Sequence, residues 1–397
     1  MPPAAQSKGP PAVVLGLNLT ALGTIRALAR QGVRVTALGV REGRPSEHTR
    51  WARQISDARC DTEACAELLE ELAPRFPEPP VLFASADHHV LLMSRERERL
   101  QRSYRYVLPA PELVEALMDK GRLLRWSLEH AVPIPRTAVV VDEQGAREAA
   151  ETLRFPCVLK PAVRPPDWTE HWPKVLPVAT PQELLEAWHR MADAGVQLVV
   201  QEVIPGGDDR VCFGLLYIDR EGQAWAVAEG RKLRQQPPQF GTTSLAISCP
   251  PGTVADAAVA VLQGNGYLGI GGVEFKEDPR DERLYMTEPT VGRPDLQSPL
   301  ATAAGVNIPY AAYCDAAGLP LPEVPATRVG LKWCHERDDF AAAGAYRRQG
   351  QLSWGAWLRS LQGPRTYATL AWDDPVPFAL LSLGFVARAV GVRSRWW

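Results

Sequence analysis

The first hundred residues alternate between short apolar runs and a segment with helical spacing, and this pattern constrains the fold most. Residues 12–17 predict a buried strand, residues 19–31 have the apolar periodicity of a helix, and residues 33–38 predict a second strand. Residues 81–84 predict another strand after a proline-rich stretch. Strands that alternate with helices form parallel sheets, because each return crossover needs a helix. We therefore expect a doubly wound α/β domain near the N-terminus.

The middle of the chain predicts a mixed region that becomes antiparallel. A helix is expected from Pro111 to about His130, where prolines stop it. A capping-box pattern at residues 180–183 predicts a helix to about Ala194. A polar, proline-containing segment, residues 231–243, is expected to be a mobile lid loop. Apolar runs separated by turn signals predict strands at 137–141, 155–160, 197–204, 211–218, 223–229, 270–276 and 283–289.

Composition excludes several classes of protein. The formal net charge is -2, so no overall basic field favours nucleic acid. The seven cysteines are odd in number and form no C-x-x-C pair, so neither a disulfide framework nor structural zinc is expected, and a cytoplasmic location is the simplest prediction. No apolar run reaches the ~18 residues of a membrane span.

The two ends of the chain carry weaker signals. Residues 1–11 are rich in proline, alanine and small polar residues and are expected to form a disordered lead. The apolar run at 376–390 predicts a C-terminal helix packed on the core. Contact of that helix with a membrane surface is the alternative, because basic and aromatic residues follow it.

Polar positions follow one another in an order that suits a nucleoside triphosphate. Lysines are compact point charges for phosphate oxygens. A strand end supplies an apolar slot and backbone groups for adenine, and carboxylates bind ribose hydroxyls and Mg²⁺. Each position alone is typical of a solvated surface, and only their order favours a nucleotide site. In chain order they are Lys120, Lys160, Glu202, Val203, Ile204, Asp208, Asp209, the basic residues of 231–234, Glu274 and Glu288.

Several stretches resemble one enzyme family. Residues 118–120 and 155–161 resemble the start of an ATP-grasp domain, and residues 201–206 resemble its adenine-binding strand. Residues 230–241 are similar to the phosphate-loop region of ATP-grasp carboxylate–amine ligases of the D-aspartate ligase type. Residues 271–275, Glu288 and residues 304–309 resemble the metal-binding end of such ligases. The likeness covers roughly residues 12–315.

The resemblance implies an α/β plus α+β architecture of the ATP-grasp type. An N-terminal doubly wound α/β (pre-ATP-grasp) domain would span 12–108. The ATP-grasp domain would span 109–325, with a lid subdomain at about 133–203. A C-terminal helical extension would cover 326–397. ATP would lie between the lid and the larger part of the ATP-grasp domain.

The implied activity is ATP- and Mg²⁺-dependent ligation of a carboxylate to an amine through an acylphosphate, with Mn²⁺ as an alternative metal. Phosphoryl transfer from ATP to the carboxylate would come first, and attack by the amine would release phosphate. The residues carried over fall into five roles. Lys120, Lys160 and Lys232 would hold phosphates; Glu202, Val203 and Ile204 adenine; Asp208 or Asp209 ribose; Arg234 and Arg293 would stabilise transferring charge, and Glu274 and Glu288 the metal.

One motif departs from the family pattern. The usual metal motif is Glu-x-Asn-Pro-Arg, whereas this chain has Glu288, then Thr290 at the asparagine position. A threonine hydroxyl can ligate Mg²⁺, and Asp295 could add a further oxygen. Arg293 is shifted by one residue from the expected arginine, which leaves its role as an oxyanion clamp open.

Two other functions stay open at this stage. A non-catalytic ATP-grasp-like nucleotide-binding or scaffold protein is one, and Thr290 is its main support. A nicotinamide-dependent oxidoreductase is the other, because the chain starts strand-Gly16-x-Asn18-helix, but no G-x-G-x-x-G follows. The expected substrates are small-molecule, peptide or glycan carboxylates and amines. A homodimer is an open alternative to a monomer.

Overall fold

The computed structural model describes four stretches of the chain, residues 9–162, 168–173, 175–191 and 195–389. Contacts within it divide the chain into two compact units. Unit 1 comprises Met1–Val114, Cys212–Val273 and Thr290–Trp397, and unit 2 comprises Glu115–Val211 and Glu274–Pro289. Within the described stretches, no helix combines the length and apolar character that spanning a bilayer requires.

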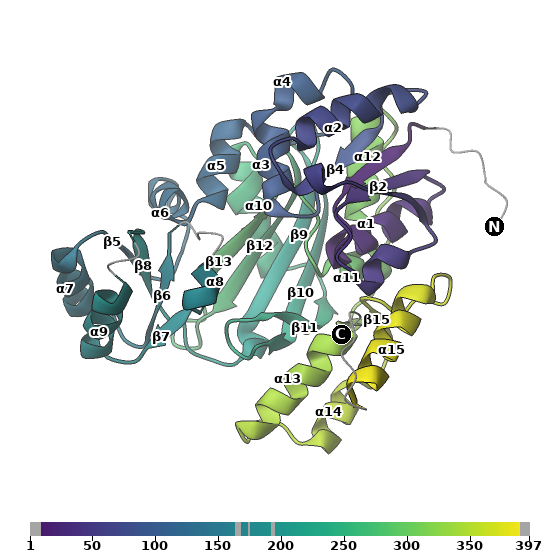
Figure 1. Cartoon of the computed structure of the whole chain (residues 1–397). Coiled ribbons are helices and arrows are strands. Elements are labelled where there is room, and N and C mark those ends of the chain that lie inside the picture. The colour runs from purple at the N-terminus through teal and green to yellow at the C-terminus, as the bar shows by residue number, and fades with distance from the viewer. Residues whose placement is uncertain (1–8, 163–167, 174, 192–194, 390–397) are drawn as a thin grey trace. The chain divides into compact units, whose positions relative to one another are not determined.

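Unit 1 begins with the predicted parallel sheet. Its four strands lie in the order β3-β2-β1-β4, and all of the neighbouring pairs are parallel (Figure 1). The strands are β1 (Ala12–Leu15), β2 (Val35–Gly39), β3 (Ala52–Ser56) and β4 (Val81–Phe83). The doubly wound α/β prediction is confirmed, although β3 was missed because its sequence mixes charged and apolar residues without a buried face.

Local chemistry fixes the first helix, α1 (Leu19–Ala29). The Asn18 side chain accepts a hydrogen bond from the Ala21 amide at 2.9 Å and caps the helix. Gly16 makes the turn from β1 into α1 at φ +97°, and a Cβ there would come within 2.1 Å of the Ser85 Oγ. Glycine is therefore required at this turn both by its backbone conformation and by space.

Shorter helices complete the N-terminal region. They are η1 (Pro45–His48), η2 (Ala58–Asp61), α2 (Cys65–Leu72), η3 (Ala73–Arg75), α3 (Asp87–Arg95) and α4 (Arg97–Leu100).

The helix expected from Pro111 to His130 is two helices. α5 (Pro111–Met118) ends before Asp119, and α6 (Lys120–Glu129) begins directly after it. Asp119 adopts an extended backbone and accepts a hydrogen bond from the Arg122 amide at 2.7 Å. The prediction of one helix was wrong because the acidic residue caps a new helix instead of continuing the old one.

Unit 2 is built on an antiparallel sheet with the strand order β5-β8-β6-β7. The strands of this sheet fall within the stretch predicted as the lid subdomain, about 133–203, whereas unit 2 as a whole extends beyond it. Two helices, α7 and α9, pack against each other, and their apolar side chains form a core with the sheet. The elements are β5 (Thr137–Val140), α7 (Glu143–Thr152), β6 (Cys157–Pro161), α8 (Trp168–His171), β7 (Leu176–Val178), α9 (Pro181–Met191), β8 (Leu198–Glu202) and η5 (Asp208–Arg210). The last predicted residues of α9, 192–194, lie outside the described residues.

A seven-stranded sheet has the order β13-β12-β9-β10-β11-β14-β15, and the division between the units falls inside β12 and β13. The strands predicted at 211–218 and 223–229 lie next to each other in this sheet, as do those predicted at 270–276 and 283–289. The strands are β9 (Val211–Ile218), β10 (Ala224–Gln236), β11 (Thr242–Cys249), β12 (Gly269–Glu277), β13 (Leu284–Val291), β14 (Lys332–Cys334) and β15 (Arg365–Tyr367). The remaining helices are α10 (Thr253–Leu262), η6 (Gln263–Asn265), α11 (Ser298–Ala304), α12 (Ile308–Ala317), α13 (Glu336–Arg348), α14 (Trp354–Ser360) and α15 (Val376–Ala389).

The predicted loop at 231–243 is largely a hairpin, so the expectation of a long mobile lid was wrong. β10 continues to Gln236 and pairs with β11 from Thr242 onward. Lys232 and Arg234, which suggested a solvated loop, are only 4% and 5% exposed. Polar residues are tolerated in this strand because buried partners satisfy them, and a sequence pattern does not reveal such partners.

The C-terminal segment, predicted to be helical, also contributes β14 and β15 to the sheet. Asp374 ties it to the N-terminal region of unit 1. Its fully buried carboxylate accepts hydrogen bonds from Arg26 Nε at 3.0 Å, Thr49 Oγ1 at 2.7 Å and the Arg50 amide at 3.0 Å. Helix α15 then packs beside η1, as the packed-helix prediction requires, although part of its apolar surface stays exposed.

Candidate functional site

The predicted metal ligands of unit 2 lie on one hairpin. Glu274 is half-buried on β12, and Glu288 is exposed on β13. The Thr287 hydroxyl contacts Glu274 twice, at 3.2 Å from its backbone oxygen and 3.3 Å from its carboxylate Oε1. The turn between the strands is closed by a hydrogen bond from the Asp278 amide to the Arg283 carbonyl at 2.9 Å. The two carboxylates therefore belong to one connected pair of strands.

The two strands run side by side along the predicted metal ligands. The Thr287 hydroxyl of β13 contacts Glu274 of β12. Further along, Gly272 lies beside Thr290, because a Cβ on Gly272 would be 3.7 Å from the Thr290 Cβ. Binding of one metal ion by Glu274 and Glu288 stays a prediction.

Strand β12 also holds the loop predicted to bind ribose. Lys276 Nζ donates to the carbonyl oxygens of Gly206 at 3.0 Å and Gly207 at 2.5 Å. One residue further, Glu277 forms an ion pair with Arg210 at 2.7 Å. Between these contacts lie Asp208, which is buried, and Asp209, which is exposed. The hairpin that carries the predicted metal ligands thus fixes the predicted nucleotide loop within the same unit.

The strand end that was predicted to bind adenine has polar groups that are hydrogen-bonded within the fold itself. The Glu202 carboxylate is buried and accepts a hydrogen bond from the Arg154 amide at 2.8 Å. The Val203 amide donates to the Pro156 carbonyl at 3.0 Å. The carboxylate of Glu202 and the amide of Val203 therefore hold the strand end in place.

The two predicted phosphate lysines differ in their surroundings. Lys160, on β6, donates from Nζ to Gln201 Oε1 at 3.0 Å, and Gln201 in turn donates to Thr137 Oγ1 at 2.9 Å. This network connects side chains of β6, β8 and β5 and fixes the position of the Lys160 ammonium group. Lys120 is the first residue of α6. A cation in the first turn of a helix opposes the helix dipole, so helix stability does not explain its placement.

Burial prevents the thiol of Cys157 from acting as a nucleophile. It raises the pKa of Cys157 on β6 to about 12, and the Glu202 charge adds to the shift. Cys157 is therefore protonated near neutral pH and is no nucleophile there.

In unit 1, the structure brings two predicted metal ligands together. The Thr290 hydroxyl donates to Asp295 Oδ2 at 2.8 Å, and the Gln297 amide donates to the other carboxylate oxygen at 3.1 Å. Arg293 donates from Nε to Asp87 Oδ1 at 2.6 Å. Asp87, a partner of a predicted catalytic arginine, was missed because it lies about two hundred positions earlier in the chain.

Arg234 lies in a buried ion pair. Its Nε and one terminal nitrogen donate to the two carboxylate oxygens of Asp339 at 2.8 and 2.9 Å, and its other terminal nitrogen donates to Ser360 Oγ at 2.7 Å. Lys232 Nζ donates to Gln235 Oε1 at 3.1 Å. These contacts give Arg234 a structural role in addition to the predicted catalytic one. Asp339 had no sequence signal of its own.

No family model matches the chain. Its similarities are to individual proteins and to solved structures. It is 25% identical to a D-aspartate ligase of Enterococcus faecium over 57% of this chain and 56% of that protein. The chain thus spans little more than half the length of that relative. It is 26% identical to a formate-dependent phosphoribosylglycinamide formyltransferase of Ignicoccus hospitalis, over 95% and 94% of the two lengths.

A solved structure agrees at the level of the fold. The biotin carboxylase domain of the Hydrogenobacter thermophilus 2-oxoglutarate carboxylase, solved with MgADP and bicarbonate, matches with a TM-score of 0.64. The match has 16% identity and covers 82% of this chain and 74% of that one. This likeness is one of fold, and the comparisons favour neither a nicotinamide-dependent oxidoreductase nor a scaffold protein. Together, these similarities support an ATP-grasp carboxylate–amine ligase.

Proposed function

We propose that this chain is an ADP-forming ligase that uses ATP and Mg²⁺ to join a carboxylate to an amine. The observation that carries the proposal is the connection inside unit 2 between the two predicted parts of the site. β12 bears Glu274, and two residues later Lys276 fixes the backbone of the loop that holds Asp208 and Asp209. A strand that links an acidic pair to a nucleotide loop suits an enzyme that handles a metal–nucleotide complex.

The donor chemistry of the hairpin fits magnesium. Carboxylates and a threonine hydroxyl are hard oxygen donors, which Mg²⁺ prefers, and no sulfur or imidazole stands among the predicted ligands. Glu274 and Glu288 would hold the ion, and Thr290 with Asp295 supplies the further oxygens proposed from the sequence. When bound, the ion would neutralise charge on the terminal phosphates of ATP.

The other side chains would bind and orient ATP. Lys160, held by Gln201, and Lys120 present positive charge to phosphate oxygens. The Ile204 amide donates to an adenine ring nitrogen, and Asp209 accepts from ribose. Lys232 would also hold phosphate, and Arg234 and Arg293 would stabilise the transferring charge.

The proposed reaction has two steps. A carboxylate oxygen of the first substrate attacks the γ-phosphorus of ATP, the bond to the β,γ-bridging oxygen breaks, and ADP leaves. The nitrogen of the amine then attacks the acyl carbon, phosphate leaves with its electron pair, and the amine loses a proton. The substrates are proposed as a class, small-molecule, peptide or glycan carboxylates and amines. Cytoplasmic location rests on the seven free cysteines, and a homodimer remains an alternative.

ADP release over a panel of carboxylates and amines tests the proposal, with hydroxylamine present to trap the acylphosphate as a hydroxamate. Glu274→Gln and Glu288→Gln should each reduce turnover at least a hundredfold while the chain stays folded, because each removes a charged ligand. Glu282→Gln is the matched control, since Glu282 is an exposed acid at the turn of the same hairpin. AMP and pyrophosphate as products would contradict the route. Full turnover in both glutamine variants would move the metal elsewhere.

A further inference from the structure

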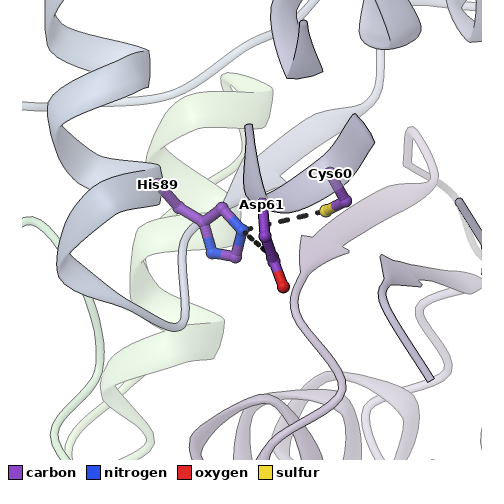
Figure 2. Close-up of side chains that lie close together, drawn as sticks. All are labelled: Cys60, Asp61 and His89. Atoms are coloured by element: carbon purple, nitrogen blue, oxygen red, sulfur yellow. Dashed lines mark hydrogen bonds and ion pairs between the residues drawn. The ribbon is translucent and has the colours of Figure 1, made fainter. Parts of the chain in front are cut away.

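A second group of potential metal ligands lies in the N-terminal region of unit 1, outside all the positions discussed so far. Cys60 and Asp61 end η2, which follows β3, and His89 lies in the first turns of α3, which follows β4. Their ligand atoms all lie within 4.8 Å of one another. Figure 2 shows the His89 ring directed at both the Asp61 carboxylate and the Cys60 sulfur.

The position in the sheet favours ligand binding. Both segments follow the carboxyl ends of parallel strands, and the strand order reverses between β1 and β4. Open α/β sheets bind ligands in the crevice at such a switch point. Gly16, at the end of β1, leaves room here, because a Cβ on it would lie 3.5 Å from the His89 Cε1 and 2.1 Å from Ser85 Oγ.

The two distances from His89 match those between ligands of one metal ion. His89 Nε2 lies 3.7 Å from Cys60 Sγ and 3.3 Å from Asp61 Oδ1. With zinc–nitrogen and zinc–oxygen distances of roughly 2.0–2.1 Å, a zinc–sulfur distance of about 2.3 Å and tetrahedral angles, the nitrogen would lie about 3.6 Å from the sulfur and about 3.3 Å from the oxygen. We propose that Cys60, Asp61 and His89 bind one zinc ion.

The orientation of the His89 ring suits this assignment. Its Nδ1 is buried and has no hydrogen-bond partner within the described stretches, so it can carry the ring proton while Nε2 faces Asp61 and Cys60. The Cys60 thiol would release its proton to solvent when the sulfur binds zinc.

The donor set selects the metal and leaves a coordination position open. One sulfur, one nitrogen and one oxygen suit a borderline-soft ion such as zinc and not the hard ions Mg²⁺ or Ca²⁺. His88 Nε2 lies 3.4 Å from the same Asp61 oxygen and is about half exposed, so it orients that carboxylate from outside. Three protein ligands with a fourth position open are typical of zinc sites that bind water or a small anion. A carboxylate is the class of ligand that this open position would take.

Cobalt spectroscopy on the full chain tests the site, because Co²⁺ replaces zinc and a thiolate ligand gives a sulfur-to-cobalt charge-transfer band. Chelator-stripped, reduced protein should bind one Co²⁺ per chain with this band, and zinc should displace it. Cys60→Ala should abolish the band. Cys249→Ala, which removes a more accessible thiol in another part of unit 1, should leave it unchanged.

A second variant keeps the test informative if Cys60→Ala does not fold. Asp61→Asn changes a side chain that is 38% exposed, so folding should survive, and circular dichroism checks this. Cobalt affinity should fall at least tenfold in that variant. The assignment is overturned if stripped wild-type chain shows no charge-transfer band at saturating Co²⁺, if the band survives in Cys60→Ala, or if Asp61→Asn binds as tightly as wild type. All of these readouts are independent of ligase turnover, so they stand or fall apart from the proposed function.

Discussion

Arg234 is the residue for which the sequence and the structure predict different behaviour, and its ion pair with Asp339 can be perturbed cleanly. The two side chains are 6% and 1% exposed, and they share two hydrogen bonds of 2.8 and 2.9 Å. Asp339 also accepts from Trp357 Nε1 at 2.8 Å and from Ser244 Oγ at 3.3 Å. Replacing Asp339 with leucine leaves a buried guanidinium without its counter-charge.

The magnitude follows from burial. Removing one partner of a buried pair typically costs about 3–5 kcal/mol, because the remaining charge stays in a low-dielectric site. Arg234→Met and Asp339→Leu should each lower stability by about that amount. The double variant Arg234→Met with Asp339→Leu should be more stable than either single variant, because replacing both charges with apolar groups of similar size is often close to neutral. The loss of the Trp357 and Ser244 hydrogen bonds would keep it about 1–3 kcal/mol below wild type.

Urea unfolding of the four proteins, followed by tryptophan fluorescence, measures these differences, and ADP release on the folded double variant separates the two roles. If Arg234 is only structural, the double variant keeps most of its turnover. If it also stabilises the transferring phosphoryl group, turnover is lost although the protein is folded. Single variants that unfold within about 1 kcal/mol of wild type would refute the claim that the pair supports the fold.

Three further outcomes are expected. Lys160→Ala should weaken binding of a non-hydrolysable ATP analogue about tenfold or more, because it removes a phosphate-facing charge, and calorimetric titration measures this; unchanged affinity would make it a surface lysine. Asp374→Ala should lower the thermal midpoint by several degrees, because it leaves Arg26 buried without its partner; an unchanged midpoint would count against this anchor. The Arg30 hydrogen bond lowers the pKa of Asp373, so this exposed pair should add below about 1 kcal/mol above pH ~4, with the gain lost as pH falls through the lowered pKa. Arg30→Gln should remove that pH dependence from urea midpoints, and a persistent one would contradict it.

The sequence by itself determined the order of the elements and the residue types of the nucleotide site. Hydrophobic periodicity and turn residues predicted β1, α1, β2 and both hairpins, because these signals are local and repeat at fixed spacing. Chain order also grouped Lys160, Glu202, Glu274 and Glu288, since a nucleotide site built from consecutive elements keeps its parts in sequence order. The resemblance to carboxylate–amine ligases rested on those same positions.

Only the tertiary structure decided which of these side chains are used by the fold and which are left for a ligand. Residues 231–236, predicted as part of a solvated loop, lie in β10, where Asp339 satisfies the buried charge of Arg234. Cys60, Asp61 and His89 carry no spacing signal for zinc, because two ends of parallel strands bring them together. Non-local contacts decide burial, pairing and direction, and a local pattern contains none of that information.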